Sequence, residues 1–209
     1  AWAAAEVKGT RRPMAADDAG QLREIVGFLH EESFVHFSVA AEIVAGMSAD
    51  DEGAAALVEA GAVEPLARAC EKLVEGAALR PALSALANIC AAHEATRTSC
   101  AEDAGLVKAA CRHAVAERTD TALLEAAAAL LANLTTVQAA VPAAAAQAEK
   151  LVDRLLAAEG GARTHVAHAV LNASQHPDFG THVLRRGGER LERLLGAELS
   201  ADDGARRAA

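Results

Sequence analysis

Apolar residues recur along this chain at the spacing of amphipathic helices, in a series of segments separated by short polar or glycine-containing stretches. No segment alternates apolar and polar residues between turn signals as a strand does. Pro65, Pro81 and Pro142 each fall near the start of a segment, where the missing N–H would lack a helical partner in any case. The pattern predicts no sheet, and helices over residues 19–31, 33–47, 52–60, 62–75, 79–92, 95–103, 105–117, 121–136, 142–147, 149–158, 163–175, 179–186 and 189–198.

Asparagine recurs near the end of three of these segments, in "LSALANIC", "AALLANLT" and "HAVLNASQ". The three residues, Asn88, Asn133 and Asn172, are 45 and 39 positions apart, and Gly46 takes the same place in "EIVAGMS", 42 positions earlier. Intervals of about 40–47 residues are typical of armadillo and HEAT arrays. Asparagine is also unfavourable in a helix interior, so its recurrence at equivalent positions indicates a specific role.

The composition limits the classes of partner. Apolar residues make up 52% of the chain and aromatic residues only 2%, so the core is built from Ala, Leu and Val, which favours close-packed helices over sheets. The net charge of −9 argues against nucleic acid or an anionic membrane as the main partner. No apolar run approaches the roughly 20 residues of a membrane span. We therefore expect a cytoplasmic chain, a monomer or part of a larger assembly, whose partner is a protein.

Candidate metal ligands and catalytic groups form no recognised pattern. His93 and His113 lie among the cysteines, but the spacings match no zinc signature. The chain has no glycine-rich phosphate loop, nucleophile elbow or paired carboxylates, so we predict no enzyme activity, cofactor or metal; the alternative is a small metal-binding or hydrolytic protein built on a helical array. The four cysteines are expected to be reduced, buried thiols in the cytosol or nucleus, at Cys70, Cys90, Cys100 and Cys111.

The phrase "ALxNL", followed by a short helix and then "G(x)VxxL", resembles the armadillo repeat family. The resemblance implies a right-handed α-solenoid of about four repeats in which each asparagine lies on a concave helix. In the peptide-binding importin type a tryptophan precedes each asparagine by four residues, and here those positions hold Ser84, Ala129 and His168, with Glu42 in the first slot. Binding of nuclear-localisation signals is therefore not expected.

A carboxamide offers one donor group and one acceptor, which matches a peptide unit of an extended ligand. A row of asparagines at one-repeat spacing could therefore hold an extended protein segment without reading its sequence. Alternatively, each amide ties its own helix end to a neighbouring loop. His165 and His168 share a helix face with Asn172, either as a pH-sensitive contact or as part of a solvated stripe. The predicted protein-binding residues on the concave face are Asn88, Asn133, Asn172, His168, His165, Ser84, Ala129 and Glu42.

A closer resemblance follows from the order of four phrases: "LREIVGFLHEESFVHFSVAAEIVAGMS", "LVEAGAVEPLARA", "ALLEAAAALLANLT" and "VLNASQHPDFGTHVL". Together they look like the amino-terminal half of the Hgh-type armadillo-like proteins, over about residues 20–199. That family is cytosolic and assists the folding of translation elongation factor two together with the chaperonin. The resemblance implies a non-catalytic scaffold or co-chaperone with such a client. The expected organisation is a disordered leader over 1–18, the repeat domain over 19–199 and a disordered tail over 200–209.

Overall fold

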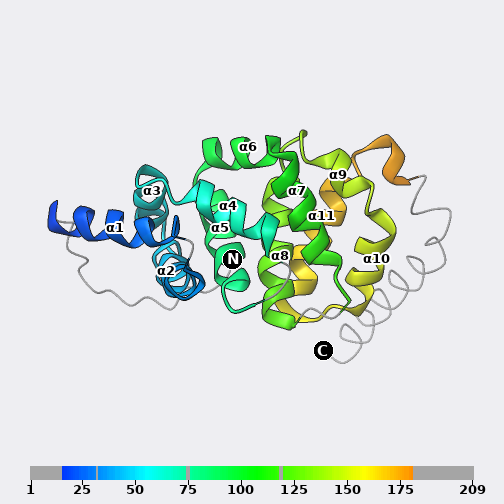
Figure 1. Cartoon of the computed structure of the whole chain (residues 1–209). Helices are drawn as coiled ribbons and strands as arrows, with labels where there is room; N and C mark the ends of the chain where they lie inside the picture. The colour runs from blue at the N-terminus through cyan, green and yellow to red at the C-terminus, as the bar shows by residue number, and fades with distance from the viewer. Residues whose placement is uncertain (1–15, 32, 74–75, 118–119, 181–209) are drawn as a thin grey trace, which may run out of the picture.

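The computed structural model describes residues 16–31, 33–73, 76–117 and 120–180, and over these residues every regular element is a helix (Figure 1). The elements follow one another from α1 at one end of an elongated body to α10 and α11 at the other. They are α1 (Ala16–Phe28), α2 (Phe34–Met47), α3 (Asp51–Glu59), α4 (Val63–Lys72), α5 (Leu79–Ala92), α6 (Glu94–Glu102), α7 (Ala104–Val115), α8 (Thr121–Leu134), α9 (Val141–Ala145), α10 (Ala148–Ala157) and α11 (Gly160–Ala173).

The helices form two layers. Four helices of 14 residues each, α2, α5, α8 and α11, pack consecutively against one another, and we call them the ladder helices. The other layer, which we call the outer layer, holds α1 beside α2 and then the pairs α3–α4, α6–α7 and α9–α10. A short helix, a longer helix and a ladder helix thus make one repeat, and the chain is a right-handed α-solenoid of armadillo-like repeats, as predicted.

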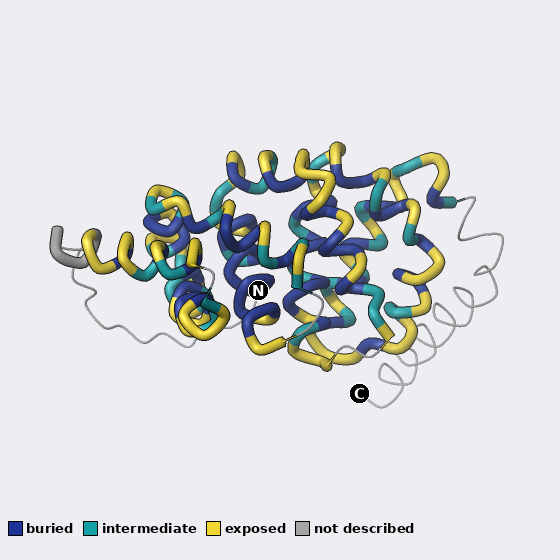
Figure 2. Tube along the Cα trace, viewed as in Figure 1, coloured by how far each residue is buried: buried dark blue, intermediate teal, exposed yellow. Residues whose placement is uncertain are grey.

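One continuous apolar core runs through the array, from Leu22 on α1 to Phe179. Small and medium side chains alternate in it: Ala85 and Leu86 on α5 meet a ladder helix whose Ala127 and Leu130 are likewise fully buried. Alanine at these positions lets neighbouring helix backbones approach closely, and leucine fills the space between them. Figure 2 shows the resulting pattern, with buried segments inside and exposed ones along the outer turns.

Polar residues fix the helix ends. The side chains of Ser33, Asp50, Asp103 and Asp120 accept hydrogen bonds from backbone N–H groups in the first turns of α2, α3, α7 and α8. Gly61 has φ 82°, in the left-handed region, where it reverses the chain between α3 and α4. These local signals explain why the helix boundaries were readable from the sequence.

The predicted helices agree with the observed ones to within three residues at each end for all the elements from α1 to α11. α1 begins at Ala16, so the first helix starts inside the region expected to be a leader. The predicted helix over 189–198, most of that over 179–186 and the tail over 200–209 lie outside the described residues. Within the described part of the chain, no helix has the length and apolarity needed to cross a membrane.

Candidate protein-binding surface

All eight predicted binding residues lie on ladder helices. Glu42 is on α2, Ser84 and Asn88 are on α5, and α8 carries Ala129 and Asn133. α11 carries His165, His168 and Asn172. Positions four residues apart share a helix face, and the asparagines occupy equivalent positions in stacked helices. We call the surface formed by these eight residues the ladder face.

Each asparagine of the ladder face bonds to the preceding ladder helix. The amide Nδ2 group donates in every case, and the acceptor lies in the last two turns of that helix or just beyond them. The bonds run from Asn88 to Ser48 Oγ (3.1 Å), from Asn133 to the Ala87 carbonyl (2.8 Å), and from Asn172 to the Ala132 carbonyl and Thr135 Oγ1 (3.2 Å each). The amide nitrogens therefore brace one repeat against the one before it.

The other half of each carboxamide is not used in this way. The Oδ1 atoms of Asn88, Asn133 and Asn172 accept no hydrogen bond from the residues that the structure describes, and the three side chains are only partly buried. Each oxygen has two lone pairs and can accept an N–H from a ligand. The nitrogens of Asn88 and Asn133 each keep one of their two N–H groups, whereas that of Asn172 uses both within the described residues. The two interpretations of the asparagines thus apply to different atoms of one group, and ligand binding by the oxygens stays a prediction.

The remaining residues of the ladder face differ along its length. Ser84 and Ala129 are small and half-buried, so α5 and α8 carry little side-chain bulk one turn before their asparagines. Glu42 forms an ion pair with Arg80 across α2 and α5, with 2.9 Å between Oε1 and Nη2. Both of these side chains are about half exposed, so the pair contributes little to stability.

The α11 end of the ladder face carries the two histidines. His168 is exposed and His165 is half-buried. Burial lowers the pKa of His165; the nearby Glu125 raises it, and His168 lowers it further. With its pKa below the usual value, His165 is uncharged at neutral pH. The α11 end therefore presents a neutral imidazole two turns before Asn172 on the same helix.

An apolar patch on α2 was not anticipated. Phe34, Val35, Val39 and Ile43 are 51%, 68%, 58% and 42% exposed, although the position of Ile43 is fully buried in the next three ladder helices, as Ala85, Leu130 and Ala169. Those three residues lie on helices that pack against a preceding ladder helix, whereas α2 is the first ladder helix among the described residues. The apolar run "FVHFSVAAEIVAGM" was the available signal, but periodicity alone could not tell which side would be covered.

The cysteines are packed into the core. All four are free and buried. Burial raises the pKa of the Cys111 thiol to about 12 and holds that of Cys70 above its usual range, so both stay protonated at neutral pH. Among the described residues, no three His, Cys, Asp or Glu side chains come together in a group that could hold a metal ion.

Comparison with known proteins defines the fold. No protein-family model matches the chain, and no curated protein matches it. A solved structure of computationally designed armadillo repeat proteins for modular peptide recognition is 21% identical, with a TM-score of 0.64 over 88% of this chain and 83% of that one. A designed armadillo repeat protein in complex with the peptide (KR)4 has the same coverage and TM-score at 19% identity.

An engineered protein of known structure is 27% identical, with a TM-score of 0.70; the match covers 86% of this chain and 44% of that one. These similarities agree with the repeat read from the asparagine spacing. The chain has an armadillo-like helical repeat fold.

Proposed function

We propose that this protein is a non-catalytic scaffold that holds an extended segment of a partner protein on the ladder face. The observation that carries the proposal is the row of asparagine Oδ1 atoms on α5, α8 and α11, which accept no hydrogen bond from the described residues. Similar solved structures support the general role, because designed proteins of this fold were made for peptide recognition and one was solved with a bound peptide.

The spacing of the ladder helices suits an extended ligand. Packed helices have axes roughly 8–10 Å apart, and an extended chain advances about 3.3 Å per residue. Successive asparagine oxygens would therefore accept N–H groups from residues two or three positions apart in the ligand. Because the fixed amide nitrogens orient the oxygens in advance, the ligand would bear less of the entropic cost of forming these bonds.

For the identity of the client, we extend the proposal to translation elongation factor two, with the chaperonin as a further partner and the cytoplasm as the location. This step rests on the resemblance of about residues 20–199 to the amino-terminal half of the Hgh-type co-chaperones. A client that exposes extended segments while it folds would suit a surface that binds backbone groups.

The ladder face can be blocked without removing a structural hydrogen bond. We would replace Ala129 by arginine, which adds a long side chain in the middle of α8, one turn before Asn133. The matched control is Ala55→Arg on α3, where the alanine is exposed in the outer layer. Binding of purified elongation factor two, followed by fluorescence anisotropy, should weaken at least about tenfold in A129R, or roughly 1.4 kcal/mol, and stay unchanged in A55R.

Two outcomes separate the parts of the proposal. If the unmodified protein does not bind elongation factor two, the client is wrong, and a library of extended peptides then tests the scaffold role through the same A129R variant. If A129R binds its ligand as well as the unmodified protein does, the ladder face is not the binding surface.

A further inference from the structure

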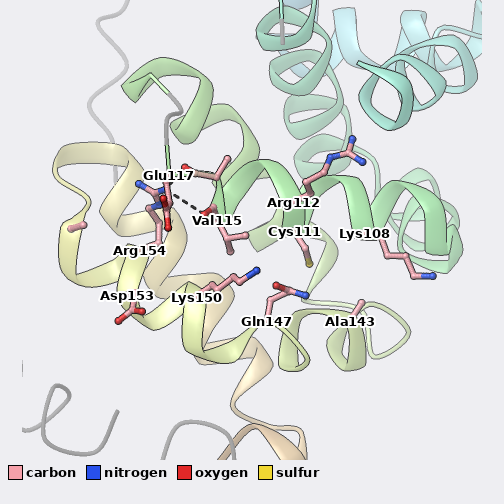
Figure 3. Close-up of a pocket in the computed structure, with 12 residues that line it drawn as sticks. Lys108, Cys111, Arg112, Val115, Glu117, Ala143, Gln147, Lys150, Asp153 and Arg154 are labelled. Atoms are coloured by element: carbon pink, nitrogen blue, oxygen red, sulfur yellow. Dashed lines mark hydrogen bonds between the residues drawn. The ribbon is translucent and has the colours of Figure 1, made fainter. Parts of the chain in front are cut away.

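A groove opens in the outer layer, between α7 on one side and α9 and α10 on the other, with a volume of about 760 Å³. Its lining mixes aliphatic and polar side chains: Val115 lines it from α7, and Ala143, Gln147 and Lys150 line it from the side of α9 and α10 (Figure 3). A volume of this size lies within the usual range for ligand sites, about 300–1,000 Å³.

The groove has the opposite charge to the chain as a whole. Four cationic residues line it, against two acidic ones, Glu117 and Asp153, in a chain of net charge −9. The cations come from one motif, a lysine followed four residues later by an arginine, which occurs on α7 and again 42 residues later on α10. The two copies are Lys108 with Arg112 and Lys150 with Arg154. Adjacent repeats thus place equivalent basic pairs side by side.

The two arginines form hydrogen bonds to the preceding repeat. Arg112 Nη2 donates to the Cys70 and Glu71 carbonyls at the end of α4, at 3.3 and 3.0 Å. Arg154 donates in the same way to the carbonyls of Val115 and Ala116 at the end of α7. The negative ends of α4 and α7 therefore compensate part of the positive charge of both guanidinium groups.

The two lysines are not engaged in this way. Lys108 and Lys150 are exposed, and neither forms an ion pair with any of the residues that the structure describes. Figure 3 shows Lys150 extending from α10 toward α7, beside Gln147 and opposite Cys111, while Lys108 lies toward the other end of α7. The lining of the groove thus includes two lysines without an ion pair to the described residues, together with the aliphatic Val115 and Ala143.

We propose that this groove binds an acidic segment of a partner protein in which two carboxylates are separated by two, mainly aliphatic, residues. Helices of neighbouring repeats lie roughly 8–10 Å apart, and residues three positions apart in an extended chain are about 10 Å apart. One carboxylate then meets Lys150 beside Gln147, and the other meets Lys108. The aliphatic residues between them pack against Val115 and Ala143. This site lies in the outer layer and is separate from the ladder face.

The probe is a fluorescein-labelled peptide, AELAELA, titrated with the full chain and followed by anisotropy. The variant is Lys108→Gln with Lys150→Gln, and the control is Lys72→Gln, at an exposed lysine of α4 outside the groove. We expect the double variant to bind the peptide about five to ten times more weakly, as suits two exposed charge pairs, and K72Q to bind it normally. The glutamine peptide AQLAQLA should bind the unmodified protein as weakly as the double variant binds AELAELA.

A charge-reversal variant tests whether weak binding by K108Q/K150Q comes from lost charge or from unfolding. K108E/K150E should bind AKLAKLA more tightly than the unmodified protein does, with the same helical circular dichroism spectrum as the unmodified protein. Equal affinity of K108Q/K150Q and the unmodified protein for AELAELA would overturn the proposal. So would loss of peptide binding in A129R, because the peptide would then occupy the ladder face. Displacement of the peptide by inorganic phosphate but not by acetate at equal concentration would identify a phosphate site and overturn the choice of a carboxylate ligand.

Discussion

Asn133 offers the sharpest test of the bracing between repeats, because two substitutions that look similar should behave differently. Its Nδ2 atom donates to the Ala87 carbonyl at 2.8 Å. Alanine removes this bond, at a net cost of roughly 0.5–1.5 kcal/mol, but regains up to about 0.7 kcal/mol as a better helix former. The melting temperature of Asn133→Ala should therefore stay within about 3 °C of the unmodified protein, taking 2–4 °C per kcal/mol for a chain of this size.

Asn133→Asp keeps the shape of the side chain but cannot donate when ionised. The new carboxylate would face the Ala87 carbonyl oxygen in a half-buried position, with a cost of about 1–3 kcal/mol. It would also stand in the last turn of α8, at the negative end of the helix, which adds roughly 0.3–1 kcal/mol. We expect a total of about 2–3 kcal/mol and a melting temperature roughly 4–12 °C lower, measured by circular dichroism.

Acid should reverse the effect of the aspartate. The folded state disfavours the ionised carboxyl, so its pKa is raised on folding, and the folded state binds the proton more readily than the unfolded one. The loss of stability caused by Asn133→Asp is therefore fully present above the pKa that the carboxyl has in the folded state. It shrinks as the pH falls through that pKa, because the protonated carboxyl can donate a hydrogen bond to the Ala87 carbonyl. The control is Gln138→Asp, at an exposed position in the turn after α8. Equal melting temperatures for N133A and N133D, at pH 7 and about pH 4, would refute the bracing role.

Three further predictions concern the stability of the helical array. Gly53→Ala should lower the melting temperature markedly, because its added Cβ would lie 1.9 Å from the Met47 carbonyl oxygen, a backbone atom that cannot turn aside; an unchanged value would contradict this packing. His113 is buried, its Nε2 lies 3.1 Å from the Cys70 carbonyl oxygen, and burial lowers its pKa. Stability in urea should therefore fall as the pH drops below about 6.5, where the unfolded state gains a proton first, and His113→Gln should show a flatter dependence. Arg154→Met should shift the urea midpoint by the equivalent of about 1–2 kcal/mol through loss of two charge-assisted hydrogen bonds, and a smaller change would mean that solvent replaces them.

The repeat and its helices could be read from the sequence because their signals are local. The apolar period lies within one helix, and the asparagine interval is a recurrence along the sequence itself, so the helix over residues 79–92 was predicted with the bounds that the structure shows for α5. The expected burial of all four cysteines is confirmed for the same reason, since each lies within an apolar helical segment.

The partners of these residues could not be read, because they lie a full repeat away. Asn133 bonds to Ala87, 46 positions earlier, and only the packing of α8 on α5 brings the two together. Lys108 and Lys150 are 42 positions apart and meet at one groove through the stacking of α7 and α10. The exposed patch at Val39 and Ile43 likewise follows from the place of α2 at the start of the ladder, which no local pattern records.

The hydrogen bonds between repeats share a direction. In the described part of the chain, asparagine and arginine side chains that reach the preceding repeat are always the donors, and the acceptor always belongs to the earlier residue, as with Asn88 and Ser48 or Arg112 and Cys70. During synthesis from the amino end, each acceptor surface is therefore complete before its donor leaves the ribosome, and every new repeat can close on a finished one.

The same direction makes the two ends unequal toward truncation. Loss of a late repeat leaves behind hydroxyl and carbonyl acceptors, and several of these carbonyls lie in the last turn of a helix, where water can bind them instead. Loss of an early repeat leaves the guanidinium groups of Arg112 and Arg154 without the helix ends that compensate part of their charge, which costs more stability.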